Sequence, residues 1–118
     1  MQYDLAAIRA SWTKDQLAQN RVPSMWRYAS VLPAAASEAV TLTEGWTPLH
    51  HAVSLGRELG ATDLWIKDEG RNPTDSFKAR GLSCAVTMAN KLGLRKLAIP
   101  SAGNAASALA AYGTFSCR

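Results

Sequence analysis

The stretch "NPTDSFKARG", Asn72 to Gly81, decides how this sequence is interpreted. A turn-forming Asn-Pro opens it, and a mostly small or apolar helical run follows from Ser76 to Leu92. Asp75 is the predicted N-cap of this helix, and Gly93 is its predicted stop. The helix has one polar stripe, and its other residues are expected to be largely buried.

Lys78 is then the third residue of this helix. The positive end of the helix dipole disfavours a cation there, and burial beside Phe77 and its small neighbours disfavours it further. Both effects favour a neutral amine, the form that attacks an aldehyde. The alternative interpretation is an exposed lysine whose stem covers the apolar face of the helix.

A second loop, "PSAGN", leaves the predicted strand "RKLAIP" and enters the predicted helix "AASALAAY". Ser101, Gly103 and the free backbone N–H groups at the start of that helix predict an anion-binding concavity. Asn104 adds a side chain that can donate or accept, and the alanines after it leave room for a flat ring or a carboxylate. An ordinary strand-to-helix turn is the alternative.

The order of predicted elements is that of an α/β fold, with a parallel sheet and covering helices. Residues 1–39 are interpreted as a helical N-terminal arm, with short helices capped by Thr13 and Ser24. Residues 40–118 form the body. It begins with a helix capped by Thr47 and stopped by Gly60, followed by a strand in "DLWIKDE".

Composition excludes several classes of protein. The chain has 118 residues and a net charge of +4 from scattered Lys and Arg, so we expect no nucleic-acid partner. No apolar run is long enough to cross a membrane, and two cysteines without a CxxC pair fit the cytoplasm. Cys84 is interpreted as a core residue. His50 and His51 have no ligand partner at suitable spacing, so we expect no metal site.

The paired motifs "KDEGRNPTDSFKARG" and "IPSAGNAASALAAY" closely resemble the N-terminal part of the threonine synthase branch of the pyridoxal-phosphate-dependent enzymes. "SMWRY", "EGWTPL" and "LWIKDEG" fit this branch better than the dehydratases, cysteine synthases or tryptophan synthase β chains. The resemblance covers roughly Tyr3 to Tyr112. It implies an incomplete N-terminal part of the fold type II architecture.

The resemblance also implies the roles of individual residues. Lys78 is expected to be the Schiff-base lysine and proton shuttle for pyridoxal 5'-phosphate. Phe77 would pack the cofactor site, and Asn104 would bond the cofactor's ring hydroxyl. The substrate carboxylate would be received by the loop Ser101, Ala102, Gly103, Asn104 and Ala105. The implied reaction converts O-phosphohomoserine and water into threonine and phosphate, and a homodimer is one state allowed for a full-length parent.

Three departures from the family pattern have consequences. Asp75 stands where the family usually has Gly, and its charge would favour a protonated lysine and repel phosphate. Ala79 replaces the usual acidic residue. Family members are several hundred residues long and have a later Gly-rich loop for the cofactor phosphate, which we do not find.

We therefore expect a truncated or frameshifted chain that is inactive alone. The alternatives are a serine/threonine dehydratase-like or other β-replacement enzyme, and a non-catalytic remnant of such an enzyme.

Overall fold

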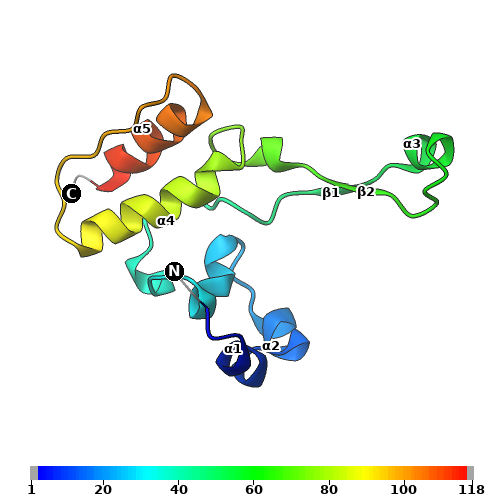
Figure 1. Ribbon diagram of the computed structural model, residues 1–118, viewed down its shortest axis with the longest axis horizontal. Coiled ribbons are helices and arrows are strands. Elements are labelled where there is room, and N and C mark those ends of the chain that lie inside the picture. The colour runs from blue at the N-terminus through cyan, green and yellow to red at the C-terminus, as the bar shows by residue number, and fades with distance from the viewer. Residues whose placement is uncertain (1–2, 117–118) are drawn as a thin grey trace.

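The computed structural model describes residues 3–116. Two long helices, α4 (Lys78–Lys91) and α5 (Asn104–Ser116), lie side by side (Figure 1). A hairpin of β1 (Leu49–His51) and β2 (Trp65–Lys67), with α3 (Val53–Glu58) at its tip, extends away from them. The remaining elements are the helices α1 (Leu5–Ser11) and α2 (Lys14–Gln19) and the 3-10 turns η1 (Met25–Val31), η2 (Ala36–Glu38) and η3 (Glu69–Arg71).

The predicted helix caps in the N-terminal arm are confirmed. Thr13 caps α2 in a capping box with Gln16, and Ser24 caps η1, which is a 3-10 rather than an α-helix. Helix α1, capped by Asp4, was not predicted. Trp26 is buried and its indole N–H donates to Ser83 on α4, so the arm docks on the long helix. The arm boundary at residue 39 stays a prediction.

The predicted helix from Thr47 to Gly60 is wrong in its first part. Leu49–His51 forms a strand that pairs antiparallel with β2, and the helix begins only at Val53. The ring of His51 stacks on Trp65 with centroids 4.5 Å apart, so a cross-strand pair outweighs the helical spacing. Leu49 and Val53 are both exposed, so these apolar side chains do not pack into a core.

The predicted parallel sheet is also wrong for the described residues. The sheet found in residues 3–116 is the antiparallel pair β1–β2, and residues 94–100 have no regular secondary structure and pair with no strand. A β-strand is stabilised by hydrogen bonds to a neighbouring strand, and no strand lies beside residues 94–100 in the described chain. The segment "RKLAIP" is therefore irregular and mostly exposed rather than a central strand.

The core lies on both sides of α4. On one side, Ala79 and Val86 pack against Ala108 and Tyr112 of α5, with Val40 and Leu42 at the edge. On the other side, the N-terminal residues Met25, Trp26 and Ala34 pack near Cys84 and Met88. Cys84 is thus half-buried in a packed cluster, and burial raises the pKa of its thiol.

Helix α4 starts later than the sequence predicted. Its first residue is Lys78 rather than Ser76, so Lys78 is not the third helical residue. Asp75 is not the N-cap, since Phe77 holds that position, and the Asp75 backbone is left-handed with φ +52°. Gly93, with φ +70°, follows the helix end as predicted. The predicted start of α5 at the end of the PSAGN loop is confirmed.

Candidate functional site

The turn before Lys78 is held by one buried asparagine. Asn72 accepts a hydrogen bond from the Gly45 backbone N–H at 3.0 Å and donates its amide to the Glu69 backbone carbonyl at 2.7 Å. The backbone carbonyl of Asn72 accepts a hydrogen bond from the Asp75 backbone N–H at 2.8 Å, which closes the turn. The start of α4 is therefore fixed by contacts with two other segments of the chain.

Lys78 is half-buried at the first position of α4. Its Nζ lies 4.8 Å from the centroid of the Phe77 ring, and Phe77 itself is 59% exposed. Within residues 3–116, no carboxylate lies within ion-pair distance of this amine. Asp75, predicted to act on Lys78 through its charge, makes no ion pair with it.

The loop of the second motif is open to water. Ser101, Ala102, Gly103 and Asn104 are exposed, and Ala105 is half-buried. Gly103 N–H donates to Ser101 Oγ at 3.2 Å. The backbone N–H groups of Ala102, Asn104 and Ala105, and the Asn104 side chain, make no hydrogen bond within the described chain. These free donors at a helix start can receive an anion.

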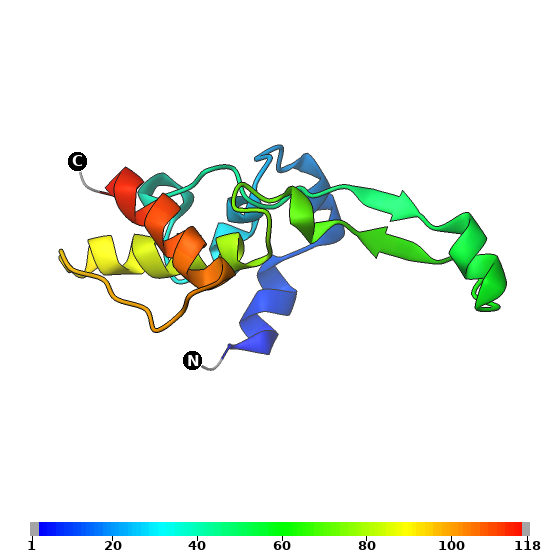
Figure 2. The ribbon, with the colours of Figure 1, turned by 90° about the horizontal axis from the view of Figure 1, so that it is seen from above.

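The two motifs lie at the same end of the helix pair. Helices α4 and α5 run in the same general direction, and both begin at the end nearer the hairpin (Figures 1 and 2). Lys78 is the first residue of α4 and Asn104 the first of α5, so both lie at this end. No hydrogen bond joins them within residues 3–116. The residues assigned by resemblance are thus grouped, although the loop has no covering wall in the described chain.

A buried carboxylate that the sequence did not reveal joins α5 to the N-terminal arm. Glu44 is fully buried, and its carboxylate accepts from Trp26 Nε1 at 3.0 Å, Tyr112 Oη at 2.7 Å and the Leu42 backbone N–H at 3.0 Å. Thr41 Oγ1 donates to the same carboxylate. Burial, followed by the hydrogen bond to Glu44, raises the pKa of Tyr112 well above its usual range.

The first part of the polar stripe of α4, at Arg80, Ser83 and Thr87, contacts other segments of the chain, whereas Asn90 and Lys91 at its end are exposed. Ser83 and Thr87 are buried, and they bond the backbone carbonyl and N–H of Val40 at 2.8 and 2.9 Å. Arg80 donates Nε and Nη2 to the Glu69 carboxylate at 2.7 Å each. The hydrogen bond from Arg80 is the largest cause that lowers the pKa of Glu69 to about 2. Helical spacing alone could not predict the hydrogen-bond partners of these side chains, because the partners lie far away in sequence.

Two hydroxyls in the turn before Lys78 have no partner. Thr74 Oγ1 and Ser76 Oγ are buried and make no hydrogen bond within the described chain. A buried hydroxyl without a partner is costly, so these atoms fit a site that a ligand or further polypeptide completes.

The histidine pair of β1 makes only loose contacts. His50 and His51 lie 3.5 Å and 3.9 Å from Asp68 and Asp63, at exposed positions. No cluster of three or more metal-ligating side chains occurs within residues 3–116. In the same part of the chain, no helix has the length and apolar character that crossing a membrane requires.

Comparison with known proteins gives one consistent result. A family model described as pyridoxal-phosphate dependent enzyme matches residues 40–116. Threonine synthase of Methanocaldococcus jannaschii is 41% identical over 111 residues, which cover 93% of this chain and 27% of that protein. Threonine synthase of Methanosarcina acetivorans is 42% identical over 111 residues, which cover 94% of this chain and 26% of that protein.

A bacterial threonine synthase, from Mycobacterium tuberculosis, is 48% identical over 73 residues, which cover 62% of this chain and 20% of that protein. The chain spans about a quarter of the length of the two archaeal relatives. No solved structure shows significant similarity.

Proposed function

The chain belongs to the family of pyridoxal-phosphate dependent enzymes, and from that premise we propose that it is the lysine-bearing part of a threonine synthase. The reaction of the whole enzyme would convert O-phosphohomoserine and water into threonine and phosphate. The observation that carries the proposal is the grouping of Lys78 and the PSAGN loop at the shared end of α4 and α5.

The residues present fit the cofactor. Lys78 offers an amine that is free of ion pairs within the described chain, and Asn104 offers an amide without a hydrogen-bond partner there. When bound, pyridoxal phosphate supplies an electron sink for chemistry at the carbons of an amino acid. Lys78 Nζ would hold the cofactor covalently through its aldehyde carbon, and Asn104 would donate to its ring hydroxyl.

The other assigned residues would orient the substrate. Ser101 Oγ and the free N–H groups of Ala102, Asn104 and Ala105 would bind its carboxylate, with Gly103 keeping the loop close. Lys78 would then remove and return a proton at the substrate α-carbon. Phe77 would pack beside the cofactor; it already lies against Lys78.

Borohydride reduction in the presence of pyridoxal phosphate tests the assignment of the lysine. We expect peptide mapping to find the label on Lys78, and Lys78→Ala to remove it. Lys91 is paired with Glu38 at 2.8 Å, and Lys67 donates to the Thr47 carbonyl. Lys96→Arg is a matched control at an exposed site. A label found mainly on Lys67, Lys91 or Lys96 would contradict the proposal.

A dehydratase-like or other β-replacement enzyme is the alternative within the family. With a full-length parent, phosphate release from O-phosphohomoserine favours the threonine synthase, and ammonia release from serine or threonine favours a dehydratase. The third hypothesis is that the chain is a non-catalytic remnant of such an enzyme. An absorbance scan for bound cofactor separates it from both, because a remnant would show no cofactor band that depends on Lys78.

A further inference from the structure

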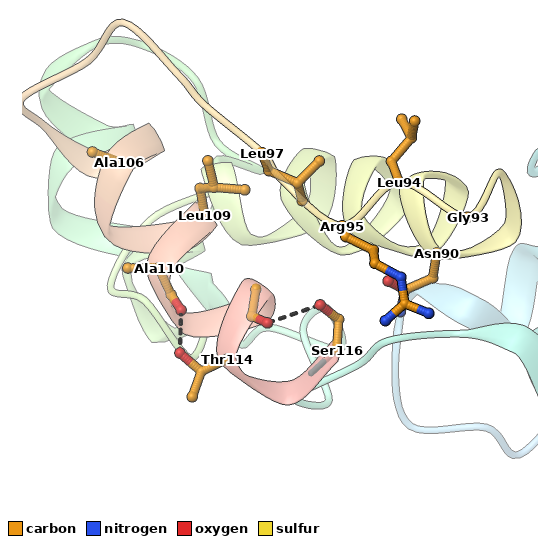
Figure 3. Close-up of a pocket in the computed structure, with 11 residues that line it drawn as sticks. Asn90, Gly93, Leu94, Arg95, Leu97, Ala106, Leu109, Ala110, Thr114 and Ser116 are labelled. Carbon is orange, nitrogen blue, oxygen red and sulfur yellow. Dashed lines mark hydrogen bonds between the residues drawn. The ribbon is translucent and has the colours of Figure 1, made fainter. Parts of the chain in front are cut away.

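A small cavity of about 230 Å³ lies between η1, the β1–β2 hairpin and α4. Its lining includes three cationic side chains from these separate segments, Arg27, Lys67 and Arg80, and we call it the cationic pocket. A larger cavity of about 1090 Å³, between α5 and residues 93–97, has one charged side chain among its described lining residues, Arg95 (Figure 3). The concentration of positive charge therefore distinguishes the smaller cavity.

The positive charge of the cationic pocket is only partly neutralised. Arg80 is paired with Glu69, with Arg80 Nε 2.7 Å from Glu69 Oε2. Arg27 and Lys67 donate to backbone carbonyls, which carry no formal charge, and neither forms an ion pair within residues 3–116. Two of the three cations thus lack a carboxylate partner in the described chain. A cavity lined by charge of one sign attracts ligands of the opposite sign.

Arg27 also has a hydrogen-bond donor that is not satisfied. Its Nε is buried and has no hydrogen-bond partner within the described chain. An unpaired buried donor is costly, so a bound acceptor would stabilise this arrangement. The guanidinium carbon lies 4.5 Å from the centroid of the Trp46 ring and 5.5 Å from that of Tyr28. These cation–π contacts hold the guanidinium in place before any ligand binds.

Trp46 has a backbone conformation that is uncommon for a bulky residue. Its φ is +51°, in the left-handed region. The side chain is 53% exposed, although its ring lies against Arg27. Strained residues of this kind concentrate at ligand sites. Trp46 and Tyr28 both line the cationic pocket, so they place aromatic rings beside its cations.

We propose that the cationic pocket binds a phosphate group, either inorganic phosphate or the phosphate of a small monoester. A phosphate group carries nearly two negative charges at neutral pH, which matches the two cations that lack carboxylate partners, whereas a carboxylate carries only one. A guanidinium binds phosphate oxygens in a fixed geometry, and a lysine adds a point charge. The cavity has the volume of several water molecules of about 30 Å³ each, so it admits a group of this size.

The cationic pocket is distinct from the proposed reaction centre. Its lining contains none of the residues assigned to the cofactor or the substrate. Arg80 follows Lys78 by two positions on α4, and side chains at such spacing point to different sides of a helix. The inference therefore goes beyond the proposed reaction and does not depend on it.

Nuclear magnetic resonance of the full 118-residue chain locates the bound anion. The isotope-labelled chain is titrated with inorganic phosphate at constant ionic strength, and the Arg27 Nε–H and backbone N–H signals are followed. We expect saturable shifts at Arg27 Nε–H and at the Thr47 backbone N–H, both in residues that line the cavity. Residues 101–105 report on the other anion-binding loop. Shifts confined to residues 101–105, or the lack of any saturable shift, would overturn the proposal.

Lysine variants show whether the affinity comes from this cavity or from the basic chain as a whole. Lys67→Gln should weaken phosphate binding by about tenfold, since it removes one charged donor. Lys67→Arg keeps the charge and should retain most of the affinity. Lys96→Gln makes the same change in net charge at an exposed position outside the cavity and should leave the affinity nearly unchanged. Lys67 is exposed too, so its variants should fold. Equal losses in Lys67→Gln and Lys96→Gln would overturn the proposal.

Phenyl phosphate and benzoate test the class of ligand, because they share a ring and differ in the charged group. We expect phenyl phosphate to bind about tenfold more tightly than benzoate, owing to its second charge and additional acceptor oxygen. Equal affinities would overturn the assignment to phosphate. If phenyl phosphate binds more tightly than inorganic phosphate, the ligand is a monoester whose organic part contacts Trp46 and Tyr28; the reverse order identifies free phosphate. All of these are binding measurements, so their failure leaves the assignment of Lys78 to be judged by its own test.

Discussion

Tyr112 donates its hydroxyl to Glu44 at 2.7 Å, although 68 residues separate the two in sequence. Both side chains are fully buried. The same carboxylate also accepts from the indole of Trp26, so one buried group connects α5, the N-terminal arm and the segment that leads into the hairpin. Removing one member of such a network leaves a buried polar atom without its partner.

We expect Tyr112→Phe to lower the free energy of unfolding by about 1–2 kcal/mol and Glu44→Gln to lower it as well. In a double-mutant cycle the two changes should be coupled by about 1 kcal/mol or more, because Glu44→Gln replaces one accepting oxygen with an amide donor in the network that Tyr112 donates to. Urea unfolding followed by tryptophan fluorescence measures both quantities. Tyr3→Phe, at a 52% exposed position, is the control and should change stability little. Additive effects of the two buried changes would contradict the network.

Acid should weaken the fold through Glu69. The pKa of this carboxyl is lowered from 4.5 to about 2 in the folded chain, with Arg80 as the main cause. Its contribution to stability is therefore complete above pH 4.5 and is lost as the pH falls from 4.5 toward 2. Glu69→Gln should remove that part of the pH dependence in urea unfolding. Glu58→Gln, at an exposed site, should retain this pH dependence. The same dependence of stability on pH in both variants would contradict the role of the Glu69–Arg80 ion pair.

Local signals in the sequence predicted local structure well. The side chains of Thr13 and Ser24 satisfy nearby N–H groups, so their helix starts depend on only a few residues. Gly93 ends α4 for an equally local reason, its positive φ. The strand in "DLWIKDE" was also found, because its apolar and β-prone residues form β2.

Predictions that depended on distant partners failed. Leu49–His51 has helical spacing, yet its pairing with β2 makes it a strand. Residues 94–100 have strand composition but no strand beside them in the described chain. Glu44 carried no signal in sequence, since its partners Trp26 and Tyr112 lie 18 and 68 residues away.

The candidate site was predicted by resemblance more than by spacing. The grouping of Lys78 with the PSAGN loop needs the packing of α4 on α5, which no single motif specifies. The spacing argument also misplaced the helix start, because a left-handed residue ends the turn where a cap was expected. The roles assigned to Lys78 and the PSAGN loop therefore stay predictions from the resemblance, and the backbone conformation before Lys78 had to come from the structure.

We expect the 118-residue chain alone to release no phosphate from O-phosphohomoserine with added pyridoxal phosphate above the level of Lys78→Ala. Ser101 to Asn104 are exposed in the described chain, and efficient chemistry needs a site that excludes water and holds the charged groups. A coupled phosphate assay measures this. A chimera in which this chain replaces the 111 aligned residues of the Methanocaldococcus jannaschii relative is the positive comparison. Turnover by the isolated chain above the Lys78→Ala control would show that these residues suffice.

Asp75→Gly should stabilise the chain by about 0.5–1 kcal/mol, since Asp75 has a left-handed backbone that Gly adopts more easily. Asp75 caps no helix, so no cap is lost. Asp75→Ala should destabilise the chain by a similar amount, because Ala tolerates this φ poorly.

Asp75→Asn separates the effect of backbone conformation from the effect of charge, because Asn accepts the left-handed region but is neutral. Stability unchanged in Asp75→Asn, with tighter cofactor binding in both the Asn and Gly variants, would establish a repulsive charge near Lys78. A loss of about 1 kcal/mol in Asp75→Gly would instead mean that the carboxylate caps α4 in solution. Urea unfolding and cofactor absorbance titration, run on the same three variants, decide between these outcomes.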